Sequence, residues 1–83
     1  MSSRAGSSGT AHAAFLQELI RMRTQAGLSP LQLAERLDVK ESVVTRGEQG
    51  SRRVGVVELQ LWACACGLTL EEFGRRLEVR TLQ

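Results

Sequence analysis

The chain has 83 residues, of which 42% are apolar and 24% are charged, and these proportions are ordinary for one small globular domain. No apolar run approaches the roughly 20 residues that cross a bilayer, and the N-terminal residues lack the apolar stretch of a secretory signal. The composition therefore excludes a membrane-spanning protein and predicts a cytoplasmic one.

The positive charge is concentrated in the middle of the chain, although the net charge is only +2. Residues 21–53 carry seven cations and four anions, whereas residues 1–20 balance to zero and residues 54–83 to −1. A contiguous positive excess favours an anionic partner such as nucleic acid, but it does not demonstrate one by itself.

The N-terminal segment and the first helix differ sharply in composition. Residues 1–10 contain four Ser and two Gly and offer nothing to bury, so they are predicted to form a disordered leader. Helical periodicity begins near His12 and continues to about Ala26, with a broad apolar face. Gly27 follows as the natural stop of this helix.

The next segment opens with a compact signal for the start of a helix. Ser29 is a good N-cap, Pro30 fits the first helical position because its missing N–H is not needed there, and Gln32 completes a capping box. The pattern breaks near Leu37, about one turn earlier than an independent helix prefers. A new helix is predicted almost at once over residues 41–49, and a glycine ends it.

A basic loop then leads to a helix predicted over residues 56–66. We expect Val57, Leu61 and Cys64 to point inward, with Trp62 as a further candidate. The glycine that follows stops this helix.

The last helix begins at a second capping box, in which Thr69 is the cap and Glu72 stands three residues further on. The helix continues through Leu77. Five short helices with short connections and no strand signal predict an all-α bundle. We expect the folded domain to cover residues 11–80 and residues 81–83 to form a tail.

The sequence offers no constellation for catalysis or metal binding. Cys64 and Cys66 stand two apart on one predicted helix, so their side chains diverge, and we interpret both as small buried residues in a reducing compartment. The lone His12 does not complete a metal site with them. No Ser/His, Cys/His, paired-carboxylate or glycine-rich phosphate arrangement points to an enzyme, and no cofactor or small-molecule ligand is expected.

The two central helices and the short turn between them form a helix-turn-helix candidate. Small Ala34 stands where the second helix crosses the first, and Val39 and Val44 supply apolar contacts. The stretch from Leu16 to Phe73 resembles the Cro/repressor-type (XRE-type) helix-turn-helix family, whose fold is the five-helix lambda-repressor-like bundle. The resemblance rests on Arg23, Gly27-Leu28-Ser29, Leu33-Ala34-Glu35-Arg36-Leu37, Val39, Ser42, Val44, Thr45-Arg46, Glu48, Gly50, Arg52-Arg53 and the helix from Leu61 to Leu68.

The resemblance implies sequence-specific binding of double-stranded DNA by a small bacterial or phage-type transcriptional regulator, as a homodimer on a palindromic site. The second helix of the pair is then the recognition helix, because a helix fits the major groove and side chains near its N-terminal end reach base edges. The residues expected to contact bases are Glu41, Ser42, Thr45 and Arg46, and those expected to contact phosphates are Ser29, Lys40, Arg52 and Arg53.

Two of these assignments have a second interpretation. Glu41 is also suited to the positive end of the helix dipole, because it stands in the first turn. Arg52 and Arg53 also fit a solvated basic loop without a partner. Both interpretations stay open at the level of the sequence.

The resemblance implies that Arg23 and Glu48 form a partly buried ion pair between the first helix and the recognition helix. The chain departs from the family pattern at Gly47, where a large apolar or aromatic residue normally anchors the recognition helix to the core. Either this helix is mobile until it binds DNA, or Trp62 or Phe73 fills the gap, or the glycine is a substitution.

The alternative function is protein–protein contact, with the same fold serving as an antitoxin-like or adaptor module. The modest net charge and Gly47 favour it slightly. For a homodimer, the expected surface is the last helix, because it has more apolar residues than a lone domain needs. These residues are Leu70, Phe73, Leu77, Val79 and Leu82.

Overall fold

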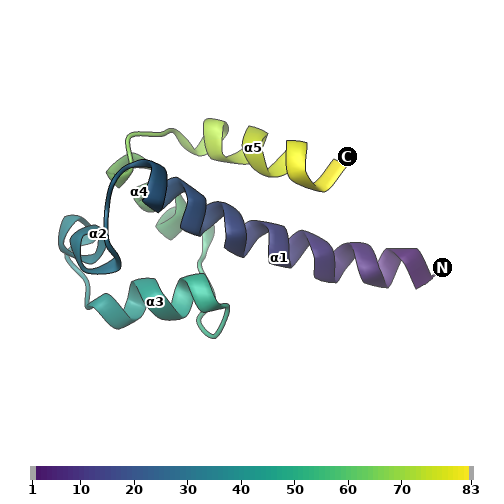
Figure 1. The fold of residues 1–83 in the computed structure, drawn as a ribbon, viewed down its shortest axis with the longest axis horizontal. Coiled ribbons are helices and arrows are strands. Elements are labelled where there is room, and N and C mark those ends of the chain that lie inside the picture. Colours follow the sequence, from purple (N-terminus) through teal and green to yellow (C-terminus); the bar gives the residue numbers. More distant parts are fainter. Residues whose placement is uncertain (1, 83) are drawn as a thin grey trace.

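The computed structural model describes residues 2–82, which form five α-helices and no strand. The helices are α1 (Ser2–Gln25), α2 (Pro30–Leu37), α3 (Glu41–Gln49), α4 (Val56–Ala65) and α5 (Leu70–Leu82). Helix α1 runs the length of the molecule, with α5 along one side and α3 along the other (Figure 1). Helices α2 and α4 gather at the end away from both termini. The predicted all-α five-helix bundle is confirmed.

The two outer helices are longer than predicted. The backbone of residues 2–10 continues α1, where the sequence predicted a disordered leader, and α5 runs into the expected tail as far as Leu82. Once the packed part of a helix has formed, each further residue adds a hydrogen bond while ordering only itself, so a helix extends beyond its tertiary contacts. Although α1 has 24 residues, no helix in the described part of the chain is long and apolar enough to cross a membrane.

Both predicted capping boxes are present. The backbone N–H of Gln32 donates to Ser29 Oγ at 3.1 Å, and the Ser29 N–H donates to Gln32 Oε1 at 2.9 Å. Thr69 and Glu72 make the same reciprocal pair at 3.0 and 2.8 Å, and the hydrogen bond from the Thr69 N–H holds the pKa of Glu72 below its usual value. These bonds satisfy N–H groups that have no partner inside the helix, so they fix where α2 and α5 begin.

The turn between α2 and α3 depends on Asp38. Its φ is 58°, which makes it the only non-glycine residue in the left-handed region among those described. Asp enters this region at a lower cost than most residues. The next residue, Val39, donates its N–H to the Ala34 carbonyl at 3.0 Å, so α2 closes tightly and α3 starts against it. The side chain of Val39 is exposed, so of the two predicted apolar contacts only Val44 is buried.

The core lies where α1 meets the other four helices. The rings of Phe15 on α1 and Phe73 on α5 meet edge to face, with centroids 5.9 Å apart at 82°. Burial of the apolar side chains supplies the main stabilisation of a domain this small. The buried apolar residues are Leu19, Met22, Leu28, Leu33, Ala34, Val44, Trp62, Ala63 and Phe73.

Helix α4 turns a different face inward from the predicted one. Val57, Leu61 and Cys64 are exposed, whereas Trp62 is buried. Because α4 is apolar nearly all round, periodicity does not identify its inner face, and the large indole decides the matter. The prediction that both cysteines are buried is therefore wrong for Cys64. Cys66 is half-buried, and burial raises the pKa of its thiol.

Most of the apolar side chains of α5 pack inside the domain. Phe73 is buried, Leu77 packs against the core and Leu70 is half-buried. Only Val79 and Leu82 remain exposed. Most of the surface expected to serve a dimer is therefore used for packing within the chain.

Candidate nucleic-acid interface

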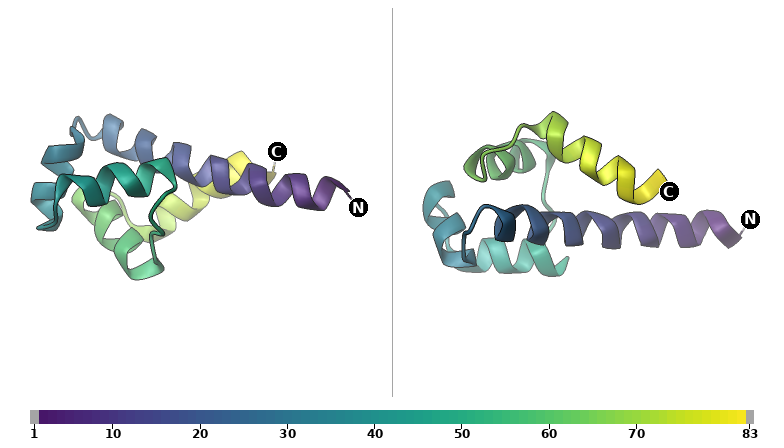
Figure 2. Two further views of the ribbon diagram at one scale, coloured as in Figure 1. Left: turned by 90° about the horizontal axis from the view of Figure 1, so that it is seen from below. Right: turned by 45° about the horizontal axis from the view of Figure 1, so that its top comes forward.

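Helix α3 presents one face to the core and the other to solvent. It lies on the opposite side of α1 from α5 (Figure 1), and it is in front when the molecule is seen from below (Figure 2). Val44, Gly47 and Glu48 are buried on its inner face. Its polar side chains are exposed at Glu41, Ser42, Arg46 and Gln49 and half-buried at Thr45, and the apolar Val43 is half-buried.

The charged side chains on the outward face of α3 have no partner among the described residues. In the described part of the chain, the side chains of Glu41 and Arg46 have no hydrogen bond or ion pair, and the Thr45 hydroxyl donates to the Ser42 carbonyl at 3.3 Å. Gln49 shares this face and was not among the predicted base contacts. Its primary amide has the donor and acceptor that match the edge of adenine, and its outward position is the signal that identifies it.

An ion pair fixes α3 from the inside. Arg23 Nε donates to Glu48 Oε2 at 2.7 Å, and its Nη2 donates to Oε1 at 3.1 Å, so the contact is bidentate. Arg23 Nη1 also donates to the Leu28 carbonyl at 3.0 Å. The two side chains are only 13% and 7% exposed. One guanidinium therefore ties α1, the loop before α2 and the recognition helix together, and such geometry fixes orientation.

The space beside Gly47 is filled by Trp62. A Cβ placed on Gly47 would lie 2.9 Å from Trp62 Cη2 and 3.1 Å from a methyl carbon of Val54. Real Cβ atoms essentially never approach another atom as closely as 2.9 Å, and a distance of 3.1 Å is tighter than nine in ten of their contacts. The indole from α4 therefore occupies the place of the anchoring side chain that the family pattern puts on α3. Of the explanations for Gly47 that the sequence left open, the structure shows Trp62 in the gap.

Ser29, one of the residues expected to contact phosphates, is the N-cap of α2. Its oxygen and its backbone N–H are both engaged with Gln32. Pro30 has no N–H, so the donors left for an anion are the Ser29 hydroxyl proton and the N–H of Leu31. The capping box thus leaves a smaller anion site than a bare helix end offers.

The cationic side chains on either side of α3 differ in whether they have a partner within the chain. Lys40 and Arg53 are exposed. Arg52 Nη2 lies 2.9 Å from Glu58 Oε2, and the hydrogen bond from Arg52 holds the pKa of Glu58 below its usual value. The sequence did not indicate this partner, because Glu58 comes from the first turn of α4. A phosphate contact by Arg52 therefore has to compete with Glu58.

Helix α2 is held to α4 by a contact that the sequence did not indicate. Arg36 Nη1 donates to the Ala65 carbonyl at 2.9 Å, near the C-terminal end of α4. A cation at a helix C-terminus also complements the helix dipole. This contact helps to hold α2 against α4.

Comparison with known proteins assigns the family. A family model described as helix-turn-helix matches residues 19–73, which is more than half of the chain, and no curated protein or solved structure matches. The matched span includes α2, α3, α4 and both partners of the Arg23–Glu48 ion pair. In the residues described, no three His, Cys, Asp or Glu side chains gather to hold a metal ion. The chain belongs to the XRE-type helix-turn-helix family, whose members are lambda-repressor-like, non-enzymatic DNA-binding regulators.

Proposed function

We propose that the protein recognises a specific sequence in double-stranded DNA, as a small bacterial or phage-type transcriptional regulator acting in the cytoplasm. The observation that carries this proposal is the unpaired polar face of α3, on a helix anchored from inside by Val44, Glu48 and the indole of Trp62. A rigid helix with such a face fits the major groove. The anchoring also argues against a recognition helix that becomes ordered only on DNA.

Base recognition is assigned to the outward residues of α3. Arg46 is suited to a bidentate contact with O6 and N7 of guanine, and Glu41 to accepting from N4 of cytosine. Ser42 and Thr45 supply hydroxyls at the same end of the helix, where side chains reach base edges. Glu41 also stands in the first turn, where it favours the helix dipole in the free protein.

Phosphate contacts are assigned to the flanks of α3. Lys40 and Arg53 are exposed there, and Ser29 stands at the start of α2. Arg52 joins them by exchanging Glu58 for a phosphate, because each side chain of this ion pair is 38% exposed and an exposed pair contributes little stability. These contacts set the register of α3 on the duplex and provide most of the salt-dependent affinity.

The first test is selection of bound sequences from random duplex DNA with the purified chain, followed by titration of the enriched site. Arg46→Ala is expected to weaken binding to that site about tenfold to a hundredfold and to relax the preference at one base pair. Arg53→Ala serves as the matched control: it should weaken specific and random DNA alike and lower the salt slope by about one unit. Equal losses for both variants on both DNAs would contradict base readout by Arg46.

The same titration separates DNA binding from the alternative of a protein-interaction module. Binding to DNA should fall by about 0.9 log units per neutralised phosphate for each log unit of salt. The modest net charge still favours the alternative slightly. Its other support was the missing bulky residue at Gly47, and that support is gone because Trp62 fills the space.

We further propose that two copies bind a palindromic site together. Exposed apolar residues follow the recognition helix on α4, where Val56, Val57 and Leu61 are 70%, 71% and 57% exposed. They follow directly the loop that leaves α3, so we place the contact with the second copy there. Palindromic half-sites about 34–36 Å apart require a dimer that presents both recognition helices to the same side of the DNA.

Sedimentation of variants tests the dimer surface. Leu61→Arg is expected to prevent self-association and cooperative binding to a palindrome, because it places a charge in an apolar contact. Leu82→Arg, on the exposed end of α5, is the matched control and should leave both unchanged. A wild-type chain that stays monomeric on DNA, or a loss with Leu82→Arg alone, rules out the α4 surface.

A further inference from the structure

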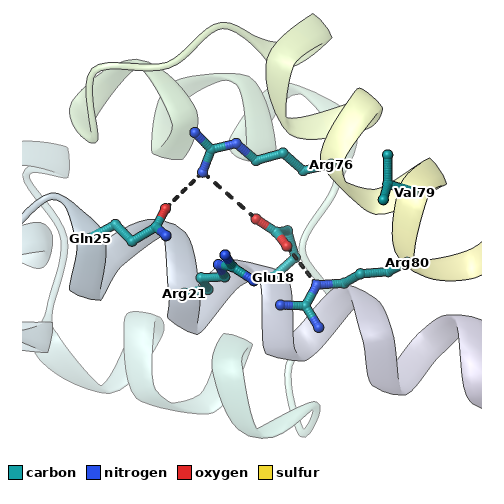
Figure 3. Close-up of a pocket in the computed structure, with 6 residues that line it drawn as sticks. All are labelled: Glu18, Arg21, Gln25, Arg76, Val79 and Arg80. Carbon is teal, nitrogen blue, oxygen red and sulfur yellow. Dashed lines mark hydrogen bonds and ion pairs between the residues drawn. The ribbon is translucent and has the colours of Figure 1, made fainter.

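A cavity lies between α1 and α5, away from the recognition helix. It has a volume of about 300 Å³ and is lined by Glu18, Arg21, Gln25, Arg76, Val79 and Arg80 (Figure 3). Because α5 and α3 lie on opposite sides of α1 in two views (Figure 1; Figure 2), the cavity is not part of the surface that α3 presents. Occupying it therefore leaves the proposed DNA face free.

The carboxylate of Glu18 is buried in the wall of this cavity and is only half satisfied. Its side chain is 2% exposed, and Oε1 accepts from Arg80 Nε at 2.7 Å. Oε2 has no hydrogen-bond partner, and Arg76 Nη1 lies 4.0 Å from it. Buried polar atoms nearly always have a partner, so Oε2 is a vacant acceptor for a donor from outside the chain.

The other charged groups around Glu18 are cationic. Three guanidinium groups and one carboxylate give the walls a net charge of +2. Arg76 Nη1 also donates to Gln25 Oε1 at 2.8 Å, and Arg76 is 40% exposed, so its side chain has room to turn. The side chain of Arg21 has no hydrogen bond or ion pair within the residues described. Guanidinium groups of this kind bind carboxylates in bidentate fashion.

We propose that this cavity binds an acidic amino acid. The ammonium group donates to Glu18 Oε2, and the two carboxylates accept from Arg21 and Arg76, so the single negative charge of the ligand opposes the excess positive charge of the walls. The volume suits a molecule of this size, and Val79 contacts its methylene groups. This proposal replaces the sequence-based expectation that no small-molecule ligand binds.

A bound ligand would bridge α1 and α5. Because it contacts side chains from both helices, it binds the folded chain and not the unfolded one, and it raises the melting temperature by mass action. The ion pairs that Glu18 makes with α5 hold the two helices together without a ligand. If that clamp were their only role, adding an amino acid would leave the melting temperature unchanged.

The test is titration of the free full-length chain with L-glutamate and L-aspartate at low ionic strength, followed by calorimetry and by thermal unfolding. Saturable binding of one of them and a rising melting temperature are expected. Arg21→Gln should weaken the affinity about tenfold or more, since a charge-assisted hydrogen bond is lost. Arg21 is exposed, so this change spares the fold. Arg75→Gln, an exposed arginine on α5 outside the cavity, is the matched control and should change nothing.

Two further compounds test the chemistry of the ligand. Glutarate lacks the ammonium group and should bind at least about tenfold more weakly than L-glutamate. Inorganic phosphate reports binding of an adventitious ion only. Flat titrations with both amino acids, or equal affinity for glutarate or phosphate, overturn the proposal. These measurements contain no DNA, so their failure is distinct from a failure of the proposed DNA recognition.

Discussion

Replacing Gly47 with tyrosine is expected to destabilise the domain by about 3 kcal/mol, because the space that a side chain needs is already filled and overpacking a core costs energy. The nearest indole carbon lies 2.9 Å from where the Cβ would stand. For a domain of this size, such a loss lowers the melting temperature by more than about 10 °C, which thermal unfolding followed by circular dichroism measures directly.

Gly74 provides a matched control for this prediction. It lies within α5, and a Cβ placed on it meets nothing within 4 Å. Gly74→Ala is therefore expected to stabilise the domain by about 1 kcal/mol through helix propensity alone. Gly47→Ala should gain nothing, since the contact with Trp62 offsets the same propensity. If both alanine variants are stabilised equally, Trp62 does not occupy the space.

A double variant shows whether Trp62 and residue 47 compete for one space. Trp62→Ala alone should cost about 3–5 kcal/mol. Combined with Gly47→Tyr, the new ring has room, so the double variant should be more stable than the sum of the single losses predicts, by about 0.5–3 kcal/mol. Strict additivity would show that the two positions are independent.

Replacing Glu48 with alanine is expected to lower the free energy of unfolding about as much as Gly47→Tyr does. Glu48→Ala leaves the guanidinium of Arg23, which is 13% exposed, without its partner, and breaking a buried ion pair in this way costs about 3–5 kcal/mol. Chemical denaturation measures the loss. At temperatures where the variant stays folded, α3 is held less firmly, so affinity for DNA should fall although Glu48 contacts no base.

The Arg75–Glu71 pair is the matched control, because its side chains are 68% and 81% exposed. Glu71→Ala should cost less than about 1 kcal/mol, as exposed pairs do. Replacing both buried partners, as Arg23→Met with Glu48→Leu, should recover most of the stability, because no charge is left unpaired. A Glu48→Ala variant no less stable than Glu71→Ala would falsify the role of this pair.

The sequence was informative wherever a structural feature depends on residues close together in the chain. The starts of α2 and α5 follow from Ser29 with Gln32 and from Thr69 with Glu72, three residues apart. The bounds of α3 and its polar outward face were predictable for the same reason, since spacing along one helix sets both. The assignment of individual residues to bases and phosphates stays a prediction.

The sequence was uninformative where several packing arrangements are compatible with the same local pattern of residues. Helix α4 is apolar nearly all round, so Val57 and Leu61 were predicted inside and lie outside. The filling of the space beside Gly47 by Trp62 depends on how α4 crosses α3, which no spacing encodes. The pairing of Arg52 with Glu58 likewise depends on the path of the loop between those helices.

The sequence by itself determined the five helices, the capped starts of α2 and α5 and the family, because hydrogen bonds at helix ends and amphipathic spacing act over a few residues. Only the tertiary structure decided which apolar face of α4 is buried and how Glu18 meets Arg80, 62 residues further along the chain. Contacts of that kind require two helices to be brought together at one angle and depth. That geometry is set by the packing of the whole core and not by any single segment.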